Sequence, residues 1–296
     1  MRAGALGDVL LLRRAVAALR RGGYEVTLLA PAASGRALLG EGPSEVQRLV
    51  DWERADVAAL LADGEVPAET VLPDLRRCEL ALACTRSEPL VRNLRALIPQ
   101  VLARDPQPPA GVPGGRWLAA ALEPVGLDIA TPPPACRATP QEEARARDFG
   151  RRLPAGFLAI HPGSGSAVKN WPATGWLELV DRLRPPEPWL VVCGPADARA
   201  AAPLRMRADV VVAEDLAVRV LGAVLARAGV FVGNDSGVSH LAAAWDAPTV
   251  ALFGPTDART WAPEGARVRT VQSRSGDMAG IGVGEVIDAV TAARTT

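Results

Sequence analysis

The most distinctive chemical feature of the sequence is the placement of its single lysine and its two histidines. The chain holds 33 lysine and arginine residues together, and Lys169 is the only lysine among them. Lys169, His161 and His240 all lie in two glycine-rich stretches, at 161–172 and 233–245. Lysine is a compact charge on a flexible stem, whereas arginine is a planar fork. A lone lysine beside glycines therefore predicts a point charge aimed at an anion such as phosphate. A genome biased towards arginine is the alternative explanation.

The first glycine-rich stretch follows an apolar run at 157–161 and has the composition of an anion-binding loop. Its glycines, at 163 and 165, permit positive φ angles, so several backbone N–H groups can point at one anion. Hydroxyl groups and the lysine follow at once. We therefore predict substrate contacts from Ser164, Gly165 and Ser166, and a catalytic contact from Lys169. Trp171, further on, is interpreted as a core residue.

The second stretch lies between an apolar run at 230–233 and a predicted helix at 238–245. Ligands of open α/β sheets bind at such junctions, where a helix N-terminus supplies partial positive charge for a diphosphate. A tight turn with a helix cap is the structural alternative to a ligand-binding loop. For His240, a packed and hydrogen-bonded core histidine is as well supported as a ligand contact. The predicted substrate-binding residues here are Asn234, Asp235, Ser236, Gly237 and His240.

Two further aspartates stand next to predicted elements. Asp197 follows the predicted strand at 189–193, where an acid commonly binds a ribose diol; a helix cap is an equally weighted interpretation. Asp8, with Gly7 beside it as a substrate-binding position, precedes a predicted helix at 9–21. Asp8 can cap that helix or act as a general base. A position at a helix N-terminus would keep the Asp8 carboxylate ionised but make it a weaker base. We favour the interpretation of Asp8 as a general base.

Short β-branched runs alternate with helical patterns along the chain, which predicts a parallel α/β architecture. Thr139, Pro140 and Glu142 have the spacing of a helix start with a capping box. The predicted strands are at 25–30, 46–52, 79–84, 157–161, 189–193, 210–213, 230–233 and 249–253. The predicted helices are at 9–21, 55–63, 116–125, 174–184, 216–227, 238–245 and 284–293.

A proline-rich segment at 131–139 is the predicted linker between two similar halves. It separates an acceptor-side domain, 1–138, from a nucleotide-sugar-binding domain, 139–296. We expect two Rossmann-like domains that face each other across a cleft. We expect the last helix to pack back on the first domain.

Composition narrows the classes of function. The chain has 33 acidic and 33 basic residues, and this zero net charge argues against nucleic-acid partners. Arginine doublets such as Arg13-Arg14 are interpreted as solvated helix faces, one of which could touch an anionic membrane. The cysteines lack CxxC spacing, so neither a zinc site nor a disulfide framework is expected. Cys84 and Cys193 end apolar runs and suit buried thiols in a reducing cytoplasm. No signal peptide and no apolar run of about 18 residues is present.

Several motifs together resemble the heptosyltransferases of bacterial lipopolysaccharide core synthesis, glycosyltransferase family nine. They occur in the order of that family and span nearly the whole chain. The Asn-Asp-Ser-Gly segment is the most specific of them. The matching segments are Gly4-Ala-Leu-Gly-Asp-Val-Leu10, His161-Pro-Gly-Ser-Gly-Ser166, Lys169-Asn-Trp-Pro172, Gly194-Pro-Ala-Asp197, Gly233-Asn-Asp-Ser-Gly-Val-Ser-His-Leu-Ala-Ala-Ala244 and Phe253-Gly-Pro-Thr-Asp257.

The resemblance implies a GT-B fold and an inverting transfer of heptose from ADP-heptose to a lipid-A–core or related glycan acceptor. By position, Asp8 matches the catalytic base, Lys169 the residue that faces the donor phosphates, and Asp197 an acid on the ribose. The residues 235–237 match contacts to the diphosphate and sugar. No metal or cofactor is implied. The implied location is the cytoplasm, with peripheral contact to the inner face of the inner membrane.

Two departures from the family pattern concern the acceptor side. The family usually continues from Gly-Asp into Thr-x-Pro-Ala, whereas this chain has Leu12-Arg-Arg-Ala15. The loop at 111–115 lacks a histidine that relatives often carry. Arg13 or Arg14 could therefore meet an anionic acceptor instead.

Two other classes of function remain open beside the transferase. One is a non-catalytic or differently specific protein of the same fold that binds nucleotide sugars. The other is a dinucleotide-dependent oxidoreductase, which is disfavoured because no G-x-G-x-x-G fingerprint occurs.

The sequence also predicts a defect in the first sheet, because a Rossmann-like unit needs a strand before its glycine-rich turn. Only three residues precede Gly4. We expect a start further upstream, and a gap or substitute strand in the first sheet.

Overall fold

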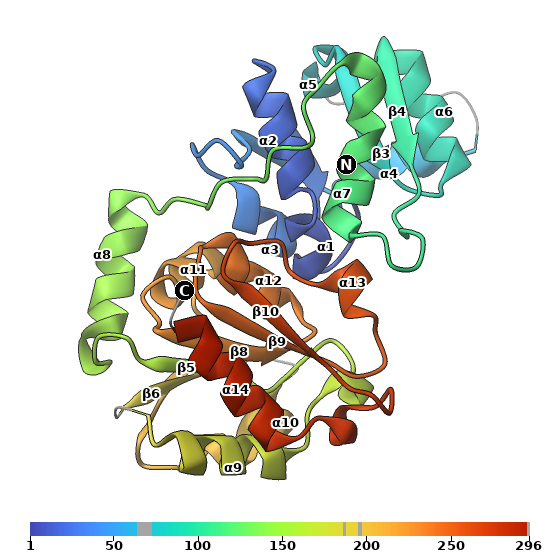
Figure 1. Ribbon diagram of the computed structural model, residues 1–296. Coiled ribbons are helices and arrows are strands. Elements are labelled where there is room, and N and C mark those ends of the chain that lie inside the picture. Colours follow the sequence, from blue (N-terminus) through green and yellow to red (C-terminus); the bar gives the residue numbers. More distant parts are fainter. Residues whose placement is uncertain (64–72, 186–187, 195–196, 295–296) are drawn as a thin grey trace. The chain divides into compact units, whose positions relative to one another are not determined.

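The computed structural model describes residues 1–63, 73–185, 188–194 and 197–294 (Figure 1). The chain divides into two compact units, Met1–Pro134 and Ala135–Thr296. The sequence-based boundary after residue 138 lies a few residues beyond this division.

The first unit contains two small parallel sheets with helices on both sides. β1 pairs with β2, and β3 pairs with β4. One helical layer, α2 with α7, packs on Leu80 and Leu82, and the other, α4 with α6, packs on Leu29 and Ala83. The elements are α1 (Leu6–Leu10), α2 (Arg13–Arg21), β1 (Thr27–Ala30), α3 (Ala32–Gly35), β2 (Arg48–Asp51), α4 (Ala55–Ala58), α5 (Pro73–Arg76), β3 (Leu80–Cys84), α6 (Glu88–Leu97), β4 (Gln100–Arg104) and α7 (Gly114–Ala119).

Residues 1 and 2 link the two sheets of this unit through their backbone. The Met1 amino group donates to the Leu82 oxygen at 2.7 Å, and the Cys84 N–H donates to the Met1 oxygen at 3.0 Å. On the other side, the Arg2 N–H donates to the Leu29 oxygen at 3.1 Å. A substitute for a central strand is therefore present, but only over these two residues.

The arginine doublet of α2 is buried, so its interpretation as a solvated face is wrong. Arg13 and Arg14 are only 3% and 9% exposed. Arg13 donates to the Pro134 oxygen at 2.6 Å, and Arg14 to the oxygens of Ile129 and Ala130 at 2.7 and 2.9 Å. Both guanidinium groups hold the segment that leads to the unit boundary. The prediction that Arg13 or Arg14 contacts an anionic acceptor is therefore not supported, because both guanidinium groups are used inside the first unit.

The second unit is a doubly wound sheet of six parallel strands in the order β10-β9-β8-β5-β6-β7. Helices α9, α10 and α14 pack on one face, and α8, α11 and α12 on the other (Figure 1). The elements are α8 (Pro140–Phe149), β5 (Leu158–His161), α9 (Ala173–Leu183), β6 (Trp189–Val192), α10 (Ala198–Arg205), β7 (Val210–Ala213), α11 (Val218–Leu225), β8 (Val230–Asn234), α12 (Gly237–Ala244), β9 (Thr249–Phe253), α13 (Ala258–Trp261), β10 (Val268–Gln272) and α14 (Val283–Arg294).

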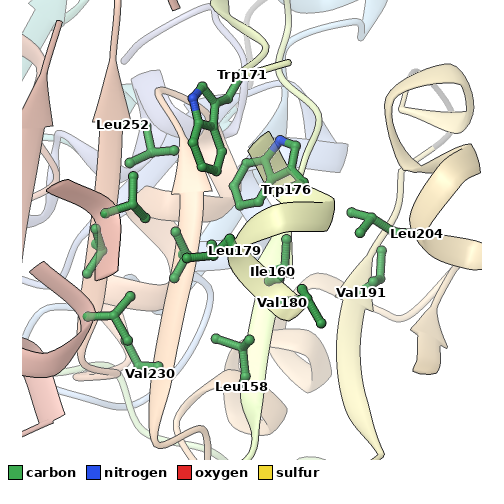
Figure 2. Packing of buried hydrophobic residues seen from close by; sticks show 14 of the residues in the cluster. Leu158, Ile160, Trp171, Trp176, Leu179, Val180, Val191, Leu204, Val230 and Leu252 are labelled. Atoms are coloured by element: carbon green, nitrogen blue, oxygen red, sulfur yellow. The ribbon is translucent and has the colours of Figure 1, made fainter. Parts of the chain in front are cut away.

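The core of the second unit fixes the strands that carry the polar loops. Trp171 and Trp176 form an edge-to-face pair with centroids 5.1 Å apart, beside Leu179 of α9 (Figure 2). Trp171 is 3% exposed, which confirms its interpretation as a core residue. Val286 of α14 belongs to the same cluster. The last helix is therefore part of the core of its own unit.

The start of α8 confirms the predicted capping box. Thr139 accepts from the Glu142 N–H at 3.2 Å, and Glu142 accepts from the Thr139 N–H at 2.9 Å. Arg219 of α11, 7% exposed, then donates to Glu142 at 2.7 Å and to the Arg137 oxygen at 2.6 Å. This arginine binds the first helix of the unit to its core.

Candidate functional site

The two glycine-rich stretches follow the two strands at which the sheet of the second unit reverses its order. From β5 the chain proceeds outward to β6 and β7, and then returns to place β8 on the other side of β5. Open parallel sheets bind ligands at this switch point, beyond the carboxyl ends of the strands. The loops after β6 and β9 lie on either side. Four neighbouring loops, all from one unit, thus form the candidate donor site.

Lys169 and Asp235 form the charged centre of this edge. Lys169 ends a short 3-10 helix, Ala167–Lys169, and its Nζ lies 2.8 Å from Oδ2 of Asp235. The lysine side chain is 31% exposed and the aspartate side chain 10%. Thr256, in the loop after β9, donates its hydroxyl proton to the same Oδ2 at 2.7 Å. Loops from three strands therefore converge on one carboxylate, which fixes the position of the lone lysine.

Asn234 holds the two glycine-rich loops together. Its side chain is fully buried. The amide nitrogen donates to the Pro162 oxygen at 2.8 Å, and the amide oxygen accepts from the Trp171 N–H at 3.1 Å. Each hydrogen-bonding side of the amide is thereby used by the neighbouring loop. The structure gives Asn234 a positioning task for the predicted substrate-binding loop.

Ser236 and Gly237 begin α12, as the pattern indicated. Ser236 is the N-cap, and its hydroxyl accepts from the Ser239 N–H at 3.4 Å. Gly237 is the first helical residue and is partly exposed. His240 is one turn further on and 8% exposed. The accessible groups at this helix end are therefore the backbone N–H groups near Gly237, which suit an anion.

Ser164, Gly165 and Ser166 lie in the first loop, where Ser164 is partly exposed. The Ser164 hydroxyl lies 2.7 Å from Oδ1 of Asn170, which secures the base of the loop. Gly165 and Ser166 are exposed. The prediction of positive φ angles in this loop is wrong, since neither Gly163 nor Gly165 has a positive φ. The loop instead uses glycine for close approach, as Gly163 shows.

Gly163 lies against Asp197, where a Cβ atom would overlap the carboxylate. Asp197 is the residue before α10; its Oδ2 accepts from the Gly194 N–H at 2.8 Å and lies 3.8 Å from Nε2 of His161. Nδ1 of His161 lies 3.2 Å from the Val192 oxygen. Burial lowers the pKa of His161, although the Asp197 carboxylate opposes this shift. Asp197 thus joins the loops after β5 and β6.

The candidate base lies in the first unit, in a helix that starts earlier than predicted. The predicted helix at 9–21 is two helices, and Asp8 is the third residue of α1 rather than its cap. Its Oδ2 accepts from the Ala5 N–H at 3.1 Å, and its Oδ1 lies 2.5 Å from Nη2 of Arg2. The side chain of Asp8 is 38% exposed, whereas that of Arg2 is 4% exposed. Gly7 precedes Asp8 within the same helix. The result is an accessible carboxylate with a buried cationic partner.

Two residues with a clear role in these arrangements were not among the predicted site residues. Arg2 orients Asp8, and Thr256 orients Asp235. Thr256 lies within the Phe253–Asp257 motif, and this motif could have identified it as a site residue. Nothing in the sequence marked Arg2, because one arginine among many has no distinguishing context.

Within the described residues, no group of three or more histidine, cysteine, aspartate or glutamate side chains could hold a metal ion. In the same part of the chain, no helix is long and apolar enough to cross a membrane.

The second unit is thus a Rossmann-like domain with its polar loops at the switch point. Residues 101–285 match the model of glycosyltransferase family 9 (heptosyltransferase). This match covers more than half of the chain, and the chain therefore belongs to glycosyltransferase family 9.

Sequence relatives match only part of the chain. Lipopolysaccharide heptosyltransferase 1 of Pseudomonas aeruginosa is 36% identical over 107 residues, 34% of this chain and 29% of the relative. Its counterpart in Salmonella typhimurium is 37% identical over 94 residues, 30% of this chain and 29% of the relative. The matches therefore span less than a third of the length of these relatives.

Solved structures match over nearly the full length. A family 9 glycosyl transferase from Veillonella parvula has a TM-score of 0.77 and 17% identity, with 99% of this chain and 96% of that chain covered. The E. coli heptosyltransferase WaaC, solved with ADP, has a TM-score of 0.70 and 17% identity, with 99% and 100% covered. The predicted α/β, GT-B class of fold is confirmed.

Proposed function

We propose that the chain is an inverting glycosyltransferase that moves heptose from an ADP-heptose-type donor to a lipopolysaccharide core or related glycan acceptor. The observation that carries this proposal is the placement of Lys169. The only lysine of the chain lies at the switch point, where a nucleotide diphosphate binds in folds of this kind. Membership of family 9 and the ADP in the similar structure of the E. coli heptosyltransferase WaaC support the choice of donor.

The donor half of the proposal uses the four loops of the second unit. Lys169 and the N-terminus of α12, which begins at Gly237, offer positive charge to the diphosphate. Ser164, Gly165 and Ser166 offer hydroxyl and N–H groups from the exposed loop. Asp197 is the acid proposed for the ribose, and Asp235 and Ser236 are proposed for the sugar and diphosphate. His240 belongs to the same group of proposed contacts.

The chemical step is a single displacement at the anomeric carbon of the heptose. The acceptor hydroxyl oxygen attacks that carbon, the bond from the carbon to the diphosphate oxygen breaks, and the hydroxyl proton passes to Asp8. Lys169 stabilises the negative charge that develops on the departing ADP. Arg2 holds the Asp8 carboxylate in place before the proton is accepted. No metal ion takes part in these steps.

The acceptor and location follow from the same proposal. A lipid-A–core acceptor is anchored in a membrane, so we place the enzyme in the cytoplasm with transient contact to the inner face of the inner membrane. A non-catalytic nucleotide-sugar-binding protein is the second candidate. It is favoured by one observation, namely that both oxygens of Asp8 already have partners within the chain.

Two measurements test the proposal. Calorimetry should show tighter binding of ADP than of UDP, GDP or NAD. Mass spectrometry should then show growth of a heptose-deficient core oligosaccharide by one heptose when ADP-heptose is supplied. Equal affinity for all nucleotides contradicts the ADP-type donor. Binding of ADP-heptose without turnover on any core acceptor favours the non-catalytic candidate.

A further inference from the structure

Gln272 is an exposed glutamine at the carboxyl end of β10, the edge strand of the second sheet. Both ends of its amide bind the backbone around the loop 254–257, which follows β9. Nε2 donates to the Phe253 oxygen at 3.2 Å and to the Gly254 oxygen at 3.0 Å, and Oε1 accepts from the Ala258 N–H at 2.9 Å. The reversed amide would set its oxygen against two carbonyl oxygens, so these contacts fix its orientation. The side chain thus ties the two ends of this loop together.

The loop that Gln272 closes carries Thr256, whose hydroxyl group holds Asp235. Thr256 donates to Oδ2 of Asp235 at 2.7 Å, and Nζ of Lys169 lies 2.8 Å from the same oxygen. The loop packs closely at Gly254, where a Cβ would lie 2.8 Å from the backbone nitrogen of Met278. A displacement of Thr256 therefore displaces the carboxylate with which the only lysine of the chain is paired.

We propose that Gln272 is a positioning residue for Lys169. It acts through the loop 254–257, whose Thr256 holds the Asp235 carboxylate. The lysine side chain is 31% exposed and has a flexible stem, so its mean position depends on the carboxylate that it contacts. Loss of the Gln272 amide releases the loop, and the ammonium group then spends less time at its place beyond the sheet. The effect on a bound diphosphate rests on the proposed function, whereas the effect on Lys169 itself does not.

A substitution of Gln272 should leave the sheet intact. β10 pairs with β9 through backbone groups, and the Ser273 N–H donates to the Phe253 oxygen at 2.8 Å whatever side chain precedes it. The Ala258 N–H lies at the start of α13 and can bind water instead, as the first N–H groups of a helix commonly do. A change at Lys169 then reports a shift of the loop and not a loss of the fold.

The test follows Lys169 directly. Because the chain has one lysine, a protein labelled with ¹⁵N at the lysine Nζ gives one side-chain NMR signal. Asp235→Asn defines the signal of the lysine without its carboxylate. Gln272→Met keeps the length of the side chain but not its amide, and it should move the signal towards that of Asp235→Asn. Thr256→Val should do the same, and Gln272→Glu, which keeps only the acceptor, serves if Gln272→Met does not fold.

A double variant tests the route by which Gln272 acts. Gln272→Met in the Thr256→Val background should add no further shift, because the loop reaches Asp235 through the Thr256 hydroxyl group. Gln141→Met, at an exposed glutamine of α8, is the matched control and should leave the signal in place. An unmoved Lys169 signal in Gln272→Met, or a further shift in the double variant, overturns the proposal.

Calorimetry with ADP is the second readout. Gln272→Met should weaken ADP binding about two- to tenfold, the range of one net hydrogen bond. This loss should vanish in the Lys169→Ala background, which a general loosening of the unit would not produce. Undiminished affinity in Gln272→Met, or an equal loss in both backgrounds, contradicts the role. If the original chain binds no ADP, the proposed donor is wrong, and the lysine signal still decides whether Gln272 positions Lys169.

Discussion

Arg14 and Arg219 donate from buried guanidinium groups to backbone oxygens, whereas Lys169 reaches a carboxylate at the edge of a sheet. The difference follows from the two side chains. A planar fork with several fixed donors suits carbonyl groups in known positions, and a flexible ammonium suits an anion that arrives and leaves. In this chain Arg14 and Arg219 thus have structural roles, and the proposed exchangeable contact belongs to the single lysine.

Replacement of Lys169 by alanine should weaken ADP binding by about 1.5–3 kcal/mol, the size of a hydrogen bond to a charged group. The loss includes a second effect, because Asp235 would then face the diphosphate without its cation. Lys169→Ala with Asp235→Asn should therefore recover part of the affinity. Calorimetry with ADP measures both variants. Arg182→Ala, which removes an exposed cation of α9 paired with Glu178, is the control and should leave affinity unchanged. Unchanged affinity in Lys169→Ala would remove Lys169 from the donor site.

Replacement of Asp8 by asparagine should reduce transfer by roughly 10²–10⁴-fold, the usual contribution of a general base. Donor affinity should hardly change, because Asp8 is proposed to act only on the acceptor hydroxyl. The amide keeps the shape of the carboxylate and can still accept from Arg2. Asp56→Asn, at a partly exposed carboxylate paired with Arg54, is the matched control. A turnover above about a tenth of the original in Asp8→Asn would rule out this residue as the base.

Sequence alone indicated the residue types of the site but not their pairings. Lys169 and Asp235 lie 66 positions apart, and their contact depends on β5 and β8 being neighbours. Nothing in either motif specifies that order of strands. Asn234 illustrates the same limit, since its motif indicates a ligand contact while its buried amide binds a neighbouring loop. A polar residue in a binding motif can serve the loop as well as the ligand.

At the scale of elements, the buried strands were predicted well and the half-exposed ones were missed. β9, fully buried, has the predicted bounds. β4 and β10 were not predicted, because each lies at the edge of its sheet and has only two or three apolar residues among its five positions. The helix α10 was missed because Pro203 lies inside it. α6 was also missed, although Ser87 caps it and a proline follows in its first turn.

The junction of β5 and β6 predicts a pH dependence of stability. Burial places the pKa of His161 below its usual 6.5, so the folded protein holds this imidazole neutral. As pH falls through about 6.5, the unfolded chain binds a proton before the folded chain does, and stability decreases. The contribution of the neutral His161 imidazole to stability is therefore fully present above about pH 6.5. The free energy of unfolding should fall by at most about 1.4 kcal/mol per pH unit between about pH 6.5 and 5.

Urea unfolding between pH 7.5 and 5 measures this effect. His161→Asn removes the titrating group but keeps a donor for the Val192 oxygen, so its stability should vary less with pH. Asp197 is the charged group that faces His161. His240→Asn is the control for the other histidine. Equal pH dependence in the original chain and in His161→Asn would contradict the argument.

At the scale of the whole molecule, the proposed donor contacts and the proposed base belong to different units. The predicted donor contacts all lie in Ala135–Thr296, and the candidate base Asp8 lies in Met1–Pro134. The second unit has a core of its own that includes α9 and α14, and Arg219 binds its first helix. Each unit thus contains what its proposed task requires: a six-stranded sheet for the nucleotide, and a positioned carboxylate for the acceptor.

A fragment of residues 135–296 should therefore fold and bind ADP with an affinity within about threefold of the full chain, because domains with their own core can fold alone. ADP should raise its Tm, since a ligand that binds only the folded state stabilises it. Calorimetry and thermal unfolding measure both effects, with Lys169→Ala in the same fragment as the control that should lose the stabilisation. The fragment should have no transfer activity, because it lacks Asp8. A folded fragment with no affinity for ADP would show that the nucleotide needs residues of the first unit.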